Sequence, residues 1–135
     1  MKIFKFLPPY QKNGKTAFPE ANNRSGVYLI KENGKLVYVG SSGYNLYKTL
    51  YRHFQTWNHK YQKVVSYKDY VKHNKYTVRL IFCTVKQAEA LEKALIIKHR
   101  PRDNEQKYDA YELDLYNKQT LKTYDNTEIS EDVPF

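Results

Sequence analysis

The sequence has very little cysteine and no long apolar run. Cys83 is the single cysteine among 135 residues, which excludes an intrachain disulfide, and the four histidines show no HExxH spacing that would suggest zinc. The longest apolar stretches, such as residues 80–83 and 95–97, are far shorter than the roughly 18 residues that a membrane helix needs. The first ten residues lack the apolar run of a secretory signal. We therefore expect a soluble, cytoplasmic protein with one compact domain.

Acidic residues are scarce in most of the chain. Residues 1–104 hold 20 of the 23 basic and 6 of the 14 acidic residues, whereas residues 105–135 hold 3 and 8. A lysine-rich composition alone would explain the net charge of +9, but it would not explain this segregation. Because Lys and Arg neutralise phosphates, a basic body with an acidic end is typical of a nucleic-acid-binding protein.

Glycine and proline are also rare, and their positions separate the expected elements. Residues 2–7 are interpreted as a short strand followed by a loop. Two short segments rich in Val, Ile and Tyr, residues 26–31 and 36–40, flank the sequence Glu-Asn-Gly at 32–34. This arrangement predicts a β-hairpin.

Two registers of this hairpin compete. A two-residue turn at Asn33 and Gly34 pairs Tyr28 with Val39, so that Tyr28 and Tyr38 project from opposite faces. A three-residue loop over residues 32–34 pairs Tyr28 with Tyr38 and places both on one face. We prefer the second register, for a chemical reason given below.

Two helices and a central strand are expected after the hairpin. Asn45 can cap a helix that runs to about residue 57 with an apolar stripe. Residues 67–73 are interpreted as a short helix, and residues 76–83, rich in β-branched and aromatic side chains, as the central strand. A capping box at Thr84 and Gln87 predicts a helix over 85–99. The stripe of the first helix consists of Leu46, Leu50, Phe54 and Trp57.

Polar residues beside the apolar faces are candidates for function. Glu92 lies at the border of the apolar face of the second helix, where a lone carboxylate is costly unless it is paired or coordinated. Thr49, His53 and Arg52 lie on one flank of the first helix. Each of these positions could also be an ordinary boundary residue.

The order and spacing of several motifs resemble the GIY-YIG nuclease family. The motifs are Gly-Val-Tyr at 26–28, Val-Tyr-Val-Gly at 37–40, Glu92, and Arg-Pro-x-x-Asn at 100–104. Residues 91–104 are similar to the equivalent helix and turn of the bacterial excision-repair endonuclease, which belongs to that family. The resemblance implies an α+β fold, with a three-stranded antiparallel sheet flanked by helices, that cleaves nucleic-acid phosphodiesters with one divalent cation.

The resemblance also implies a division of the chain. Residues 1–23 are expected as an N-terminal extension, residues 24–104 as the nuclease-like domain, and residues 105–135 as an acidic extension. DNA is the expected substrate and Mg²⁺ or Mn²⁺ the expected ion, one per site. The family includes repair enzymes and mobile-element nucleases, and the sequence does not choose between these pathways.

The roles carried over from the family concern five residues. Glu92 would hold the metal ion, which takes its other ligands from water and phosphate. Tyr38 would help to deprotonate the attacking water, and Tyr28 would position it. A phenol with a pKa near 10 is a poor base at pH 7, so the metal ion or local positive charge must lower that pKa. Both tyrosines should therefore lie on the face that the site occupies, which favours the three-residue loop. His53 would contact water or phosphate as a donor or general base, and Asn104 would brace the site.

One position departs from the family. An arginine normally stands where this chain has Thr49, so the usual phosphate-binding cation is missing. Arg52, one turn further along, could supply a guanidinium, whereas Lys48 lacks its bidentate fork. Gly40 and Ser41 begin a loop that would let DNA approach closely. Loss of such a cation typically costs about 10² to 10³ in rate, so the alternative is a weak or inactive module that binds nucleic acid and recruits partners.

The acidic end has its own prediction. Residues 108–122 alternate enough to form an edge strand or hairpin, and residues 124–135 have the composition of a disordered segment. The last five residues, Glu-Asp-Val-Pro-Phe, resemble the acidic tip of bacterial single-strand-binding proteins. Such a tip would dock on a basic pocket of a protein partner; an ordinary solvated end is the alternative.

Overall fold

A four-stranded antiparallel sheet is the centre of the computed structural model, which describes residues 1–55 and 64–107. The strand order is β1-β4-β2-β3. The expected three strands are present as β4, β2 and β3, and β1 adds a fourth at the β4 edge, so the predicted strand count was one short. The strands are β1 (Lys2–Ile3), β2 (Gly26–Glu32), β3 (Lys35–Ser42) and β4 (Tyr76–Phe82).

The N-terminal segment packs against this sheet. Strand β1 is shorter than the expected 2–7, but the main chain continues to bond to β4, since the amide of Phe4 donates to the carbonyl of Leu80 at 2.9 Å. Further along, Phe18 and Ala21 are completely buried. Burying one large apolar side chain stabilises a fold by about 1.5–3 kcal/mol, so residues 1–23 contribute to the stability of the folded body.

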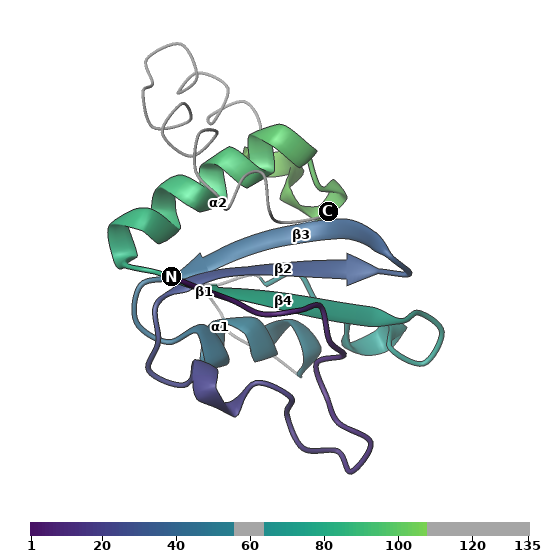
Figure 1. The fold of residues 1–135 in the computed structure, drawn as a ribbon. Helices are drawn as coiled ribbons and strands as arrows, with labels where there is room; N and C mark the ends of the chain where they lie inside the picture. The colour runs from purple at the N-terminus through teal and green to yellow at the C-terminus, as the bar shows by residue number, and fades with distance from the viewer. Residues whose placement is uncertain (56–63, 108–135) are drawn as a thin grey trace.

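Helices cover both faces of the sheet, as Figure 1 shows, with α2 on one side and α1 on the other. Helix α2 (Val85–His99) begins at the predicted capping box and has the predicted length. Helix α1 (Leu46–Tyr51) is shorter than predicted, because the chain tightens into a 3₁₀ turn, η2 (Arg52–Phe54), and becomes extended at Gln55. Residue 57 lies outside the described residues. Three further 3₁₀ turns are η1 (Pro19–Ala21), η3 (Lys68–Tyr70) and η4 (Arg102–Lys107).

The core has two layers, because side chains alternate between the faces of each strand. On the α1 side, Tyr28, Leu46 and Leu80 belong to one buried cluster. On the α2 side, Leu29 and Leu95 belong to a second. The sheet separates these clusters, and β3 forms one of its two edges.

The hairpin turn differs from the register that we preferred. Asn33 and Gly34 have φ angles of 51° and 84°, as a two-residue type I′ turn requires, and Glu32 pairs with Lys35. The prediction of a three-residue loop was therefore wrong. Asn tolerates and Gly favours the left-handed conformation, which explains why this dipeptide forms the tighter turn.

A β-bulge gives the hairpin a third register that neither alternative contained. The pairing shifts between Ile30 and Lys31, so Ile30 faces Tyr38 and Tyr28 faces Gly40. The bulge inserts one extra residue into β3. This residue returns Tyr38 to the same face of the sheet as Tyr28, whereas the two-residue turn alone would place the two tyrosines on opposite faces. Tyr28 and Tyr38 consequently share the α1 face, as predicted, for a reason that we did not foresee.

Three predictions concern the C-terminal segment after residue 107. The expected edge strand over 108–122, the acidic segment 124–135 and its terminal tip lie outside the described residues. Within residues 1–55 and 64–107, no helix is long and apolar enough to cross a membrane.

Candidate active site

A glycine on the edge strand β3 leaves room for the ring of a tyrosine on β2. Gly40 lies opposite Tyr28, and a Cβ atom built at Gly40 would overlap the phenol ring of Tyr28. The ring therefore extends over β3 in space that only a glycine leaves open. This placement brings the buried hydroxyl of Tyr28 to the edge of the sheet.

A buried hydrogen bond joins this hydroxyl to His53. The Tyr28 oxygen and His53 Nε2 are 2.7 Å apart, and His53 Nδ1 is 2.7 Å from the carbonyl oxygen of Val65. A carbonyl only accepts, so Nδ1 carries the proton and Nε2 offers its lone pair. Tyr28 is thus the donor and His53 the acceptor.

Burial keeps both groups neutral. It lowers the pKa of His53 to about 4, with the hydrogen bond to Val65 opposing the shift and the charge of Arg52 adding to it. Burial also raises the pKa of Tyr28 well above its ordinary value, and the nearby Tyr38 and Glu92 add to that rise. At neutral pH the pair is therefore a phenol and a neutral imidazole.

Tyr38 completes a cluster of three rings. Its ring stacks at 6.0 Å from that of Tyr28 and lies 4.7 Å from that of His53, measured between centroids. Tyr28 and His53 are only 1% and 2% exposed, whereas Tyr38 is partly exposed. Tyr38 is therefore the member of the cluster that solvent can reach.

Glu92 approaches the same edge from α2. Its side chain is 7% exposed and accepts a hydrogen bond from the Ser41 hydroxyl on β3. Its charge contributes to the raised pKa of Tyr28, which indicates that the carboxylate lies within electrostatic range of the phenol. Glu92 and Tyr28 thus approach the β3 edge of the sheet from α2 and β2, respectively.

The oxygen donors around Glu92 fit a hard divalent cation. Among the residues that the structure describes, no three His, Cys, Asp or Glu side chains gather into a metal-binding group. A single carboxylate with a hydroxyl nearby fits Mg²⁺, which is commonly held by one or two carboxylates and otherwise by water and phosphate oxygens.

Asn104 braces the edge strand. Its Oδ1 accepts from the amide of Val39 at 2.8 Å, and its Nδ2 donates to the carbonyl of Val39 at 2.9 Å. The amide side chain thus replaces a neighbouring strand at a site where β3 would otherwise expose unpaired backbone groups. It holds the strand between Tyr38 and Gly40 in place.

The predicted cation positions differ in their surroundings. The Thr49 hydroxyl donates to the Asn45 carbonyl within its own helix at 3.1 Å, and Lys48 is exposed. Arg52 is half-buried, and its charge is one cause of the low pKa of His53. Of these three residues, Arg52 is the one whose charge acts on the site. The hydroxyl of Ser41 is directed to Glu92.

The sequence analysis missed two residues that support His53, namely Tyr67 and Asp103. The amide of Tyr67 donates to the His53 carbonyl at 2.7 Å, and the Tyr67 hydroxyl donates to Asp103 at 2.7 Å. Burial favours the neutral acid, but hydrogen bonds from Arg102 and Tyr67 outweigh it and lower the pKa of Asp103. Asp103 directly precedes Asn104 in the Arg-Pro-x-x-Asn motif, and this position in the motif could have identified it from the sequence. Tyr67 lies in a segment without a clear sequence pattern.

Comparison with known proteins gives one match. A sequence model of the GIY-YIG catalytic domain matches residues 24–109, and neither a search of curated proteins nor one of solved structures found a significant relative. The matched range includes the hairpin, both helices and the turn that carries Asn104. With more than half of its length matched and with the α+β architecture described above, this chain belongs to the GIY-YIG family of nucleases.

Proposed function

We propose that the protein is a metal-dependent endonuclease that hydrolyses phosphodiester bonds of DNA. The observation that carries the proposal is the cluster at the β3 edge, where the hydrogen-bonded Tyr28 and His53 lie beside Tyr38 and near the carboxylate of Glu92. The basic body of the chain supports a polyanionic substrate.

Glu92 is the proposed ligand of one Mg²⁺ or Mn²⁺ ion. When bound there, such an ion would stabilise negative charge on the phosphate and acidify a coordinated water. The Ser41 hydroxyl orients the carboxylate. Ligand orientation of this kind typically affects metal affinity or activity by about 10- to 100-fold.

The proton of the attacking water is proposed to move inward. Tyr38, which solvent reaches, takes the proton of the attacking water and passes its own proton to the hydrogen-bonded Tyr28. Tyr28 in turn passes its own proton to His53 Nε2. His53 was expected to contact water or phosphate as a donor or general base. Because it is buried and both of its ring nitrogens are engaged, we assign it the second role, that of proton acceptor. With a pKa of about 4 it is a weak base in the free protein, and approaching phosphate oxygens would raise that pKa.

Arg52 is proposed to bind the phosphate in place of the arginine that Thr49 replaces. Its guanidinium offers two parallel donors to phosphate oxygens, which a lysine cannot do. It precedes His53 directly in the chain and is half-buried, so less side-chain entropy is lost on binding than for the exposed Lys48.

The test is nicking of supercoiled plasmid by the purified protein. We expect nicking with Mg²⁺ or Mn²⁺, none with a chelator, and none by Glu92→Ala. Glu89→Ala is the matched control, because Glu89 lies one turn earlier on α2 and is exposed; it should nick at the wild-type rate. Equal nicking activity of both variants would exclude Glu92 as the metal ligand.

A second candidate function is a module that binds nucleic acid without cutting it. It is favoured by Thr49, whose hydroxyl is bonded to the helix backbone, so that no cation stands in the family's usual place. In the same assay, tight DNA binding without metal-dependent nicking would support this candidate and contradict the nuclease.

A further inference from the structure

A cavity of about 420 Å³ lies beside the candidate active site. Val65, whose carbonyl holds His53, and Tyr67, whose ring is 6.1 Å from that of His53, line one wall. Glu32, Tyr70, Asn74, Arg102 and Asp103 line the rest. Its volume lies within the range of small-molecule sites, roughly 300–1,000 Å³.

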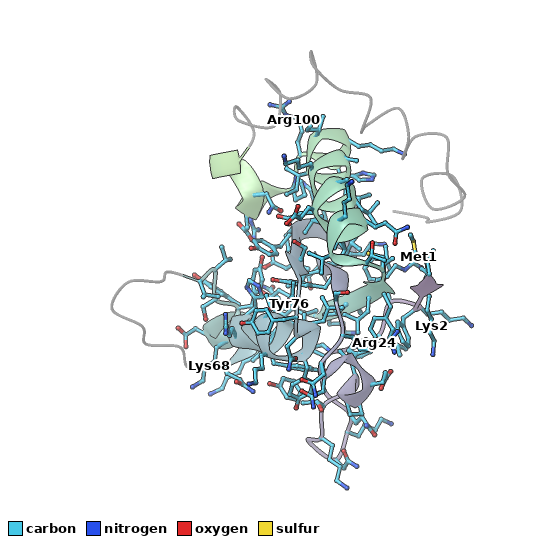
Figure 2. The ribbon with its side chains drawn as sticks, turned by 90° about the vertical axis from the view of Figure 1, so that its left-hand side faces the viewer. Met1, Lys2, Arg24, Lys68, Tyr76 and Arg100 are labelled. Atoms are coloured by element: carbon cyan, nitrogen blue, oxygen red, sulfur yellow. The ribbon has the colours of Figure 1, made fainter. Side chains whose placement is uncertain are left out.

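This cavity differs from a second one in the described part of the chain. The second has a volume of about 440 Å³ and is lined by Met1, Lys2 and Arg24 among others. In Figure 2, Lys68, which is next to Tyr67 in the chain, lies on the opposite side of the molecule from Met1 and Lys2. Only the first cavity shares residues with the surroundings of His53.

Hydrogen bonds to two carboxylates fix the orientation of the Arg102 guanidinium in the first cavity. Its Nε and Nη2 donate to Asp103 at 2.9 Å each, and its Nη1 donates to Glu32 at 3.0 Å. These bonds lie along the edge of the planar group, and the side chain is 55% exposed. A guanidinium fixed in this way is a planar surface on which a nucleobase can stack.

Tyr70 supplies a second planar surface. It lines the same cavity and is 56% exposed. Stacking of a base on an aromatic side chain contributes about 1–3 kcal/mol. The two surfaces come from segments far apart in the sequence, η3 and η4.

The charges in the cavity disfavour phosphate. Two carboxylates, Glu32 and Asp103, accompany the single guanidinium of Arg102, so the lining has a formal excess of negative charge. A phosphate would be repelled. A neutral, planar group with amino donors is a better match, and within a nucleic acid that group is the base.

We propose that this cavity binds a nucleobase turned out of its stack beside the phosphate that is cut, so that the preferred substrate is single-stranded or locally unpaired DNA. The proposal rests on the proposed function for the position of the cut. A base in an intact duplex enters such a cavity only after unstacking, which costs a few kcal/mol. The duplex should therefore bind more weakly at this cavity than the unpaired strand.

The experiment measures binding by fluorescence anisotropy of a labelled oligonucleotide, single-stranded or as a duplex, with chelator present so that no cleavage occurs. Tyr70→Ala should weaken binding to the single strand by about 5- to 150-fold, the equivalent of 1–3 kcal/mol, and should change duplex binding by less than about 2-fold. Tyr70→Phe keeps the ring and should behave as wild type. Tyr44→Ala is the matched control, because Tyr44 is 64% exposed and does not line the cavity.

Three outcomes would overturn the proposal: equal loss on both substrates, equal loss in Tyr44→Ala, or no loss in Tyr70→Ala while circular dichroism shows a folded variant. The two proposals fail separately. Plasmid nicking without strand preference would remove the base site and leave the nuclease; the predicted binding pattern without nicking would remove the nuclease and leave the base site.

Discussion

Buried His53 should make the folded state less stable as the solution is acidified from about pH 6.5 to about pH 4. Its pKa is about 4 in the folded protein and about 6.5 in an unfolded chain. Between these values the unfolded state binds more protons, so stability rises with pH. A difference of about 2.5 pKa units at 1.36 kcal/mol each corresponds to about 3 kcal/mol, fully present above pH 6.5 and lost by about pH 4.

The assay is urea unfolding at a series of pH values for wild type and His53→Gln. The glutamine does not titrate, so the gap between the two unfolding free energies should narrow by about 3 kcal/mol as the pH falls through this window. Other titrating groups, including Glu32 and Asp103 with their lowered pKa values, are common to both proteins and cancel in the difference. His73→Gln, at an exposed histidine, should follow the wild-type curve. Parallel curves for wild type and His53→Gln would refute the reasoning, since His53 would then titrate alike in both states.

Two further predictions concern the geometry of the site. Gly40→Ala should cost about 1–3 kcal/mol, because the added methyl overlaps the buried ring of Tyr28, and should lower nicking; Gly43→Ala, whose Cβ meets only the Val85 side chain at 3.3 Å, should cost less by urea unfolding. Arg52→Ala should lower the nicking rate by about 10² to 10³ and Lys48→Ala by much less; equal small effects would exclude Arg52 from phosphate binding.

The elements that could be predicted from the sequence were those specified by local chemistry. The α2 boundaries follow from side chains that bond to neighbouring amides, since Thr84 and Gln87 form the predicted capping box. The end of α1 was not predictable in this way. No proline or glycine marks it, and the apolar stripe continues through Phe54, which is buried from a 3₁₀ turn as well as it would be from an α-helix.

The hairpin shows how a correct conclusion can rest on an incorrect register. Chemistry required Tyr28 and Tyr38 on one face, and we met that requirement with a longer loop. The Asn-Gly dipeptide, however, favours a two-residue turn strongly enough to form it. The bulge in β3, opposite Ile30 and Lys31, then places Tyr38 on the same face as Tyr28. Bulges depend on pairing between strands, so no pattern within one strand predicted this one.

The tautomer of His53 shows the limit of reading a site from side chains alone. The motif positions identified His53 as a donor or general base in contact with water or phosphate, and left the choice between these roles open. Its role as an acceptor depends on the carbonyl of Val65, a backbone group that every residue type carries and that no sequence motif could mark. That carbonyl is held near the ring because the Tyr67 amide bonds to the His53 carbonyl. A direction of proton transfer is therefore a property of the folded backbone, and replacing the Val65 side chain with another of similar size should leave it unchanged.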